Sequence, residues 1–170
     1  MSSTLPKAIS GIVERELAPF SVTEARDAAD RLSMAYRDRD NIRYTLSPIE
    51  RAAYLGVRFP STFAVAQAVW AEISGVLATA EIRTILDAGS GPGTASLASV
   101  EHVPGAKCTL LERDPGWRQV GLSLAQAAGL DATFLDGTIE HTSKIQTHDA
   151  VIASYTLNEI AMTHLHRSAE

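Results

Sequence analysis

Apolar side chains recur every three to four residues through the first half of the chain, which is the spacing of one face of an α-helix. This spacing predicts helices over residues 5–18, 22–37, 48–57 and 63–79. In the second helix the apolar stripe consists of Val22, Ala25, Ala29, Leu32 and Tyr36. Because no strand-like alternation occurs before residue 80, we expect residues 1–80 to form a helical cap that precedes the rest of the fold.

The predicted helices have recognisable start signals. Ser21 is followed three residues later by Glu24, and Ser47 by Glu50. This is the spacing of a capping box, in which the two side chains satisfy backbone amides at the start of a helix. Pro60 interrupts the helical pattern, because the residue before a proline is pushed out of helical geometry. We therefore expect the third and fourth helices to be separate.

From residue 82 the pattern changes to short apolar runs. Strands are predicted over residues 83–88, 107–112, 132–135 and 149–154. Helices are predicted over residues 94–101 and 115–128, and from Leu157 onward. Strands that alternate with helices indicate an α/β fold with a parallel sheet covered by helices. Residues 81–170 are therefore expected to form the α/β part of the chain.

The composition excludes several classes of protein. The chain has 170 residues, of which 45% are hydrophobic and 21% charged, as in an ordinary globular protein. No apolar run approaches the roughly 20 residues that span a bilayer, and the first residues lack the pattern of a secretory signal. The one cysteine, Cys108, can form neither an internal disulfide nor a cysteine metal cage. We expect a cytoplasmic protein without membrane or metal partners.

Charge is divided unevenly along the chain. Residues 1–60 hold nine lysines and arginines against eight acidic residues, whereas residues 61–170 hold six against twelve. A nucleic-acid-binding surface usually has a basic footprint, so the N-terminal third is the better candidate for contact with RNA. The alternative is that its arginines pair with neighbouring acids on solvated helix faces.

The most informative stretch lies between the first predicted strand and its helix, at residues 84–94. It contains Gly89, Ser90, Gly91 and Gly93. A buried strand, a glycine turn and a helix N-terminus in this order form a pocket for a nucleotide-like ligand. The glycines allow a backbone angle closed to other residues, a close approach of the ligand, and close packing of helix on strand. These four residues are therefore candidate cofactor contacts.

Acidic residues end three of the predicted strands, at Asp87, Glu112 and Asp136. Ligands of open α/β sheets bind beside the carboxyl ends of the strands, so we expect the three acids to face one site. Glu112 follows Gly93 by 19 residues, the offset at which an acid accepts hydrogen bonds from ribose hydroxyls. This spacing fits a dinucleotide dehydrogenase or a class I methyltransferase that uses S-adenosylmethionine.

Two features favour S-adenosylmethionine. Asp87 lies directly before the turn, where its carboxylate can hold a positively charged amino group, and Pro92 has no amide hydrogen to offer a pyrophosphate. Asp136 is then expected to contact the adenine amino group. Each acid also has a simpler interpretation. Asp87 could cap the turn, Glu112 could pair with a neighbouring arginine, and Asp136 could be an ordinary turn residue.

Polar side chains also follow the fourth predicted strand. Tyr155, Asn158 and Glu159 are candidates for orienting a methyl acceptor, because in this fold the segment lies beside the reactive methyl group. No dedicated nucleophile is needed or evident, since in-line attack on a sulfonium methyl is catalysed mostly by positioning. The alternative is a helix start with Thr156 as N-cap and Glu159 as its capping-box partner.

Three stretches together resemble a known family. They are Tyr-Leu-Gly-Val-Arg-Phe-Pro-Ser-Thr at residues 54–62, Leu-Asp-Ala-Gly-Ser-Gly-Pro-Gly-Thr at residues 86–94, and Ala-Ser-Tyr-Thr-Leu-Asn-Glu-Ile at residues 153–160. The combination resembles the methyltransferase-like family associated with the small ribosomal subunit in bacteria and mitochondria, over roughly residues 40–165. The first stretch is the specific part, because the glycine motif is shared by all class I methyltransferases.

The resemblance implies S-adenosylmethionine as the cofactor, held by Asp87, Gly89, Gly91, Glu112 and Asp136, and a link to small-subunit ribosomal RNA or to ribosome assembly. It also implies the class I sheet, a Rossmann-like sheet of seven strands ordered 3-2-1-4-5-7-6. This chain supplies the four strands of the order 3-2-1-4, so we expect it to be a piece of a longer protein. Mitochondrial members are regarded mainly as assembly factors. A non-catalytic, RNA-binding role is therefore one alternative to RNA methylation, and methylation of a small molecule is another.

Overall fold

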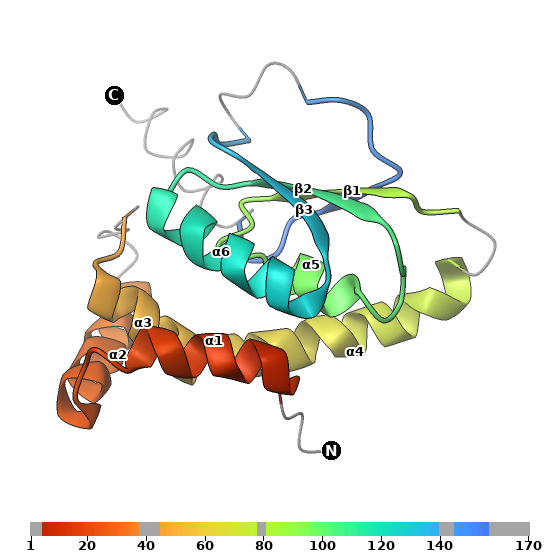
Figure 1. Cartoon of the computed structure of the whole chain (residues 1–170). Helices are drawn as coiled ribbons and strands as arrows, with labels where there is room; N and C mark the ends of the chain where they lie inside the picture. Colours follow the sequence, from red (N-terminus) through yellow and green to blue (C-terminus); the bar gives the residue numbers. More distant parts are fainter. Residues whose placement is uncertain (1–4, 38–44, 78–80, 140–144, 157–170) are drawn as a thin grey trace, which may run out of the picture.

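The computed structural model describes residues 5–37, 45–77, 81–139 and 145–156. The first half of the chain is helical, as predicted. It contains α1 (Lys7–Leu17), α2 (Val22–Arg37), α3 (Pro48–Val57) and α4 (Phe59–Leu77). Figure 1 shows that α1 and α4 lie on the same side of the sheet as the helices of the second half.

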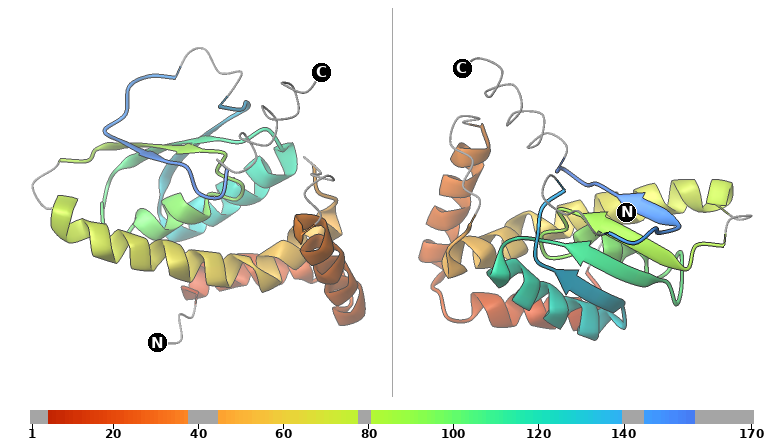
Figure 2. Two further views of the ribbon diagram at one scale, coloured as in Figure 1. Left: turned by 180° about the vertical axis from the view of Figure 1, so that it is seen from behind. Right: turned by 90° about the horizontal axis from the view of Figure 1, so that it is seen from above.

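The second half forms an α/β sheet of four parallel strands. They are β1 (Thr84–Ala88), β2 (Lys107–Leu111), β3 (Asp131–Leu135) and β4 (Ala150–Ile152). The spatial order is β3-β2-β1-β4, which confirms the predicted order. Helix α5 (Thr94–Ser99) links β1 to β2, and α6 (Pro115–Ala128) links β2 to β3. In the view from above in Figure 2, the strands lie side by side with their carboxyl ends at one edge.

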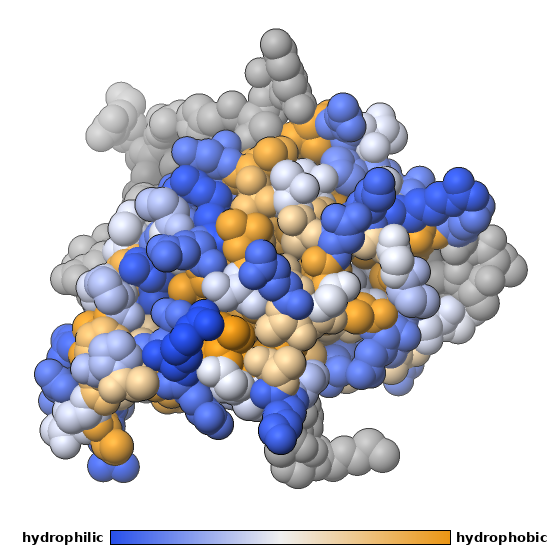
Figure 3. Space-filling view, viewed as in Figure 1, coloured by the Kyte–Doolittle hydropathy of each residue, from blue (hydrophilic) through white to orange (hydrophobic). Residues whose placement is uncertain are grey.

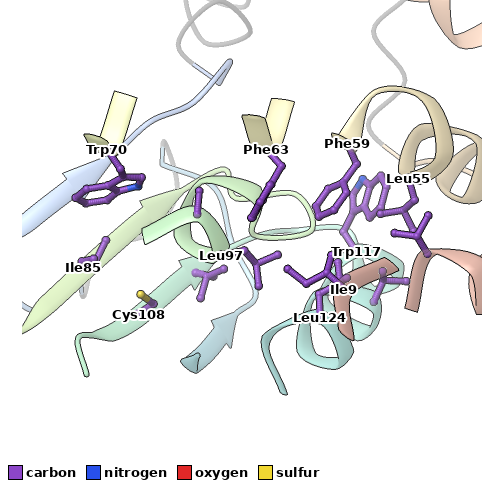
Figure 4. Close-up of a cluster of buried hydrophobic side chains, with 14 of the residues drawn as sticks. Ile9, Leu55, Phe59, Phe63, Trp70, Ile85, Leu97, Cys108, Trp117 and Leu124 are labelled. Atoms are coloured by element: carbon purple, nitrogen blue, oxygen red, sulfur yellow. The ribbon is translucent and has the colours of Figure 1, made fainter. Parts of the chain in front are cut away.

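One hydrophobic core joins the helical region to the sheet (Figure 4). Its members from the helical region include Ile9, Leu55, Phe59, Phe63 and Trp70, and its members from the α/β part include Ile85, Leu97, Leu110, Trp117 and Leu124. Burial of one such side chain contributes about 1.5–3 kcal/mol. Trp70 also donates a hydrogen bond from Nε1 to the carbonyl of Ala95, at 3.0 Å. Helix α4 therefore holds α5, and with it the end of the glycine turn.

The helix starts agree with the predicted capping signals. The amide of Ser21 donates to Glu24 Oε2 at 2.8 Å and the amide of Glu24 donates to Ser21 Oγ at 3.3 Å. The amide of Ser47 donates to Glu50 Oε2 at 2.8 Å. These bonds satisfy amides that have no partner within the helix.

Several boundaries differ from the prediction. The fourth helix begins at Phe59 rather than near residue 63, because Pro60 occupies its first turn, where the missing amide hydrogen costs nothing. Helix α5 ends at Ser99 and β4 has three residues. Val22, expected in the buried stripe of α2, is 83% exposed because it is the first residue of the helix. Farther along α2, Ala28 and Leu32 pack against α3.

The surface in Figure 3 shows hydrophobic and hydrophilic side chains interspersed over the face of the molecule that Figure 1 presents. Within the described ranges, every helix is too short or too polar to cross a lipid bilayer.

Candidate functional site

The glycine turn lies between the carboxyl end of β1 and the start of α5, as predicted. A Cβ atom at Gly93 would lie 2.7 Å from Leu110 Cδ2 of β2, and φ is +81° at this residue. Glycine is therefore required for close packing of the turn on the sheet. At Gly91 a Cβ atom would meet nothing within 4 Å, so this side of the turn is open to a ligand.

Every amide of the turn that has a hydrogen already donates to an acceptor in the protein. The amides of Gly89 and Ser90 both donate to the carbonyl of Leu111, at 2.9 and 3.0 Å. The amide of Gly93 donates to the carbonyl of Ser90 at 2.9 Å. The amide of Gly91 donates to Glu112 Oε2 at 2.8 Å. The turn thus has a fixed shape.

Glu112 directly follows β2 and closes the turn from that side. Its second carboxylate oxygen, Oε1, accepts a hydrogen bond from the amide of Asp114 at 2.7 Å. Burial raises the pKa of Glu112, and the two backbone hydrogen bonds counteract part of this shift. Two backbone amides thus hold the side chain at the edge of the turn. A carboxylate has about four acceptor positions, so two remain for a ligand.

Asp87 ends β1 with a side chain that is 1% exposed. Its Oδ2 accepts a hydrogen bond of 2.7 Å from the hydroxyl of Ser96 in α5. Burial raises the pKa of Asp87 to about 6, and the hydrogen bond from Ser96 offsets part of the shift. No ion pair joins Asp87 to a basic side chain in the part of the chain that the structure describes. A buried carboxylate of this kind favours protonation or a positively charged ligand.

Asp136 follows β3, and its side chain is 74% exposed. It accepts a hydrogen bond of 3.0 Å from Nη1 of Arg118. The same nitrogen donates to the carbonyls of Glu112 and Arg113, each at 2.8 Å. Arg118 therefore ties the end of β2 to the end of β3, and the three predicted acids lie at neighbouring strand ends.

The segment after β4 reaches the turn from the other side. The hydroxyl of Thr156 donates to the carbonyl of Gly89 at 3.1 Å. Tyr155 has a left-handed backbone with φ of +63° and a side chain that is 69% exposed. The other two predicted acceptor-side residues, Asn158 and Glu159, lie outside the described residues.

Three contacts at this site were missed by reasoning from the sequence. Ser96 binds Asp87, Arg118 bridges two strand ends, and Thr156 binds the turn. The alternative that Asp87 caps the turn is not what the structure shows, because the amide of Gly91 donates to Glu112 and the Asp87 carboxylate accepts from Ser96. A signal existed for Ser96, because a polar side chain in the small, apolar helix after the turn needs a buried partner.

Cys108 is buried in β2, and burial raises the pKa of its thiol to about 11. The thiol is therefore protonated at neutral pH and packs as a small apolar side chain. In the described ranges, no cluster of His, Cys, Asp and Glu side chains could hold a metal ion.

The sequence matches one family model over residues 48–168, that of the mitochondrial small ribosomal subunit protein Rsm22. This match covers the glycine turn, Glu112, Asp136 and the segment after β4. A comparison with curated protein sequences gives no significant match.

The fold is similar to that of a solved methyltransferase structure. The mitomycin 7-O-methyltransferase MmcR is 21% identical with a TM-score of 0.55, over 90% of this chain and 47% of that protein. TomG of Streptomyces achromogenes, an O-methyltransferase involved in tomaymycin synthesis and solved with S-adenosylmethionine, is 12% identical with a TM-score of 0.49, over 96% and 60% of the two chains. TrmN of Thermus thermophilus is 24% identical with a TM-score of 0.46, over 63% and 35%. The chain spans less than two thirds of each of these proteins.

Proposed function

This chain belongs to the Rsm22 family, and from that membership we propose that it is an S-adenosylmethionine-dependent methyltransferase that acts on small-subunit ribosomal RNA. The observation that carries the cofactor proposal is the buried carboxylate of Asp87 beside a turn whose amides are all engaged. S-adenosylmethionine combines a positively charged amino group and sulfonium with a ribose and lacks a phosphate. Its chemistry matches these surroundings.

The hydrogen bonds of the turn argue against a dinucleotide. A dinucleotide-binding turn offers free backbone amides to the pyrophosphate. Here the amides of Gly89, Ser90, Gly91 and Gly93 have acceptors in the protein, and Pro92 has no amide hydrogen. The Glu112 carboxylate next to the turn would repel a phosphate. A ligand without phosphate is therefore favoured.

The carboxylates at the strand ends suit opposite ends of the cofactor. Asp87 would balance the positive charge of the amino-acid part, and Glu112 would accept hydrogen bonds from the ribose hydroxyls. Asp136 would accept a hydrogen bond from the adenine amino group while its exposed carboxylate keeps the hydrogen bond from Arg118. When bound, S-adenosylmethionine supplies an electrophilic methyl group on its sulfonium. The contribution of the protein is to hold an acceptor in line with that methyl, for which Tyr155 is the described candidate.

Calorimetry with S-adenosylmethionine, S-adenosylhomocysteine and NADH tests the cofactor proposal. We expect the first two ligands to bind and NADH to give no heat. Binding of NADH in place of S-adenosylmethionine would contradict the assignment of the turn. When variants of the site residues are tested in the same way, Asp131→Asn is a suitable control. It changes an exposed residue at the amino end of β3, at the edge of the sheet opposite the glycine turn.

Transfer of a labelled methyl group separates the possible acceptors. Small-subunit ribosomal RNA and a pool of small metabolites are each incubated with the protein and labelled S-adenosylmethionine. Label in the RNA supports the proposal. RNA binding without label would indicate an assembly role, and label in a metabolite would indicate a small-molecule methyltransferase.

A further inference from the structure

The glycine turn is held from two sides by the neighbouring strands of β1. On the β2 side three hydrogen bonds reach it, two at the carbonyl of Leu111 and one at the carboxylate of Glu112. On the β4 side, among the described residues, the turn is held by the hydroxyl of Thr156 bound to the carbonyl of Gly89. Between described residues, fewer hydrogen bonds therefore restrain the β4 side of the turn than the β2 side.

Thr156 also fills the space next to Gly89. A Cβ atom at Gly89 would lie 2.5 Å from Thr156 Cγ2 and would contact Oγ1 as well. The hydroxyl lies 3.3 Å from the carbonyl of Ser154 too, so it bridges the end of β4 to the turn. The left-handed backbone of Tyr155 reverses the chain so that Tyr155 faces solvent while Thr156 faces the turn. Such a conformation is uncommon for a residue other than glycine.

We propose that Thr156 is a positioning residue whose hydroxyl fixes the glycine turn from the β4 side. The inference rests on the proposed function, because the turn is taken to bind S-adenosylmethionine. Thr156 acts through Gly89 and is not itself a catalytic residue.

The hydroxyl of Thr156 should affect ligand binding because of where its hydrogen bond to Gly89 lies. A ligand that reaches from Glu112 across the turn toward β4 places its reactive end on the side that, in the part of the chain that the structure describes, Thr156 holds. Removal of the hydroxyl frees the carbonyl of Gly89 and lets the turn sample other shapes. The bound ligand then has to order the turn again, which lowers its affinity.

Two substitutions separate this role from simple packing. Thr156→Val keeps the shape of the side chain and removes the hydroxyl, whereas Thr156→Ser keeps the hydroxyl and removes the methyl group. Thr133→Val makes the same chemical change at an exposed position of β3 and serves as the control. For each protein, the affinity for S-adenosylmethionine is measured by calorimetry and the thermal midpoint is measured without ligand.

We expect Thr156→Val to weaken binding about 3- to 10-fold, the loss of one hydrogen bond. Thr156→Ser should bind within about twofold of the unchanged protein even where its thermal midpoint is lower. Equal affinity of Thr156→Val and the unchanged protein overturns this proposal alone. Affinities that follow the thermal midpoints, with Thr156→Ser the weaker binder, also overturn it. Absence of binding by the unchanged protein overturns the proposed function together with this proposal.

Discussion

Ser96 donates a hydrogen bond of 2.7 Å to Asp87, and both side chains are at most 1% exposed. The pair places a carboxylate inside the protein, beneath α5, with one hydroxyl to satisfy it. Because the described residues supply no basic partner, this carboxylate is the group at the site whose ionisation costs the most.

The stability of the protein should depend on pH through Asp87. Burial raises the pKa of Asp87 from 3.8 to about 6 in the folded state. Between about pH 4 and pH 6 the folded state therefore holds a proton that the unfolded state has lost, so the free energy of unfolding falls as the pH rises. Relative to Asp87→Asn, the unchanged protein should lose about 3 kcal/mol across this interval. Urea unfolding at pH 4, 5, 6 and 7 measures it.

The control for this stability change is Asp131→Asn, whose carboxylate is exposed. The difference between this variant and the unchanged protein should stay constant over the same pH values. A constant difference for Asp87→Asn would mean that Asp87 ionises as easily in the folded state as in the unfolded state.

The affinity for S-adenosylmethionine should fall as the pH falls below about 6. Protonation of Asp87, whose pKa is about 6 in the free protein, removes the negative charge that attracts the cationic ligand. The limiting slope is about tenfold per pH unit. Asp87→Asn should bind about 10- to 150-fold more weakly at pH 7.5 and show little pH dependence. Calorimetry from pH 5 to pH 8 gives both results, and a parallel slope in the variant would assign the effect to another group.

The affinity for S-adenosylmethionine should respond even to a change of a single atom in the Glu112 side chain. Glu112→Ala should weaken S-adenosylmethionine binding by about 10- to 150-fold through the loss of charge-assisted hydrogen bonds. Glu112→Gln should be nearly as weak, because its amide nitrogen must face the amide of either Gly91 or Asp114, which are both donors. Glu101→Gln, at an exposed acid after α5, is the control. Unchanged affinity of Glu112→Ala would show that another acid or another ligand is involved.

Two alanine substitutions in the turn should have opposite main effects. Gly93→Ala places a Cβ atom 2.7 Å from Leu110 Cδ2 and should cost more in unfolding free energy than the 1–2 kcal/mol of its left-handed backbone. Gly91→Ala meets open space and should cost only the 1–2 kcal/mol of its own left-handed backbone, with φ of +55°, yet its methyl group stands where the ligand approaches. Urea unfolding and calorimetry on both variants check this. The prediction fails if Gly91→Ala binds as tightly as the unchanged protein.

Asp114 should be important for stability rather than for binding. Its buried carboxylate caps α6 through the amides of Gly116 and Trp117, at 2.7 and 3.3 Å. It also accepts from the amide of Leu46 at 3.2 Å and lies 3.8 Å from the guanidinium of Arg51. Asp114→Ala should cost about 2–4 kcal/mol, and Asp114→Asn about 1 kcal/mol because asparagine caps helices equally well. Urea unfolding measures both, and equal losses would show that the ion pair outweighs the cap.

The strands and the turn could be predicted from local signals, whereas the order of the strands could not. The glycines, the acids at the strand ends and the capping pairs each act over a few residues, and the family resemblance supplied the strand order. The buried stripe of α2 was less well predicted. Ala28 rather than Val22 packs on α3, because the contact depends on where the neighbouring helix lies.

The contacts that complete the site could not be predicted because they join distant residues. Thr156 and Gly89 are separated by 67 positions, and Arg118 and Asp136 by 18. Nothing in either local sequence indicates the other partner. The Ser96–Asp87 pair spans nine positions and depends on how α5 rests on β1. Pairing across a sheet is a property of the assembled fold.

The hydrogen bonds of the turn amides fix the shape of the loop in advance of binding. A loop whose donors are already satisfied before a ligand arrives is preorganised, so it loses little conformational entropy when the ligand binds. It also contributes shape rather than recognition. Selectivity among ligands then belongs to the side chains of Asp87 and Glu112. An engineer who wishes to change the cofactor preference of this scaffold should exchange these two carboxylates and leave the backbone of the loop untouched.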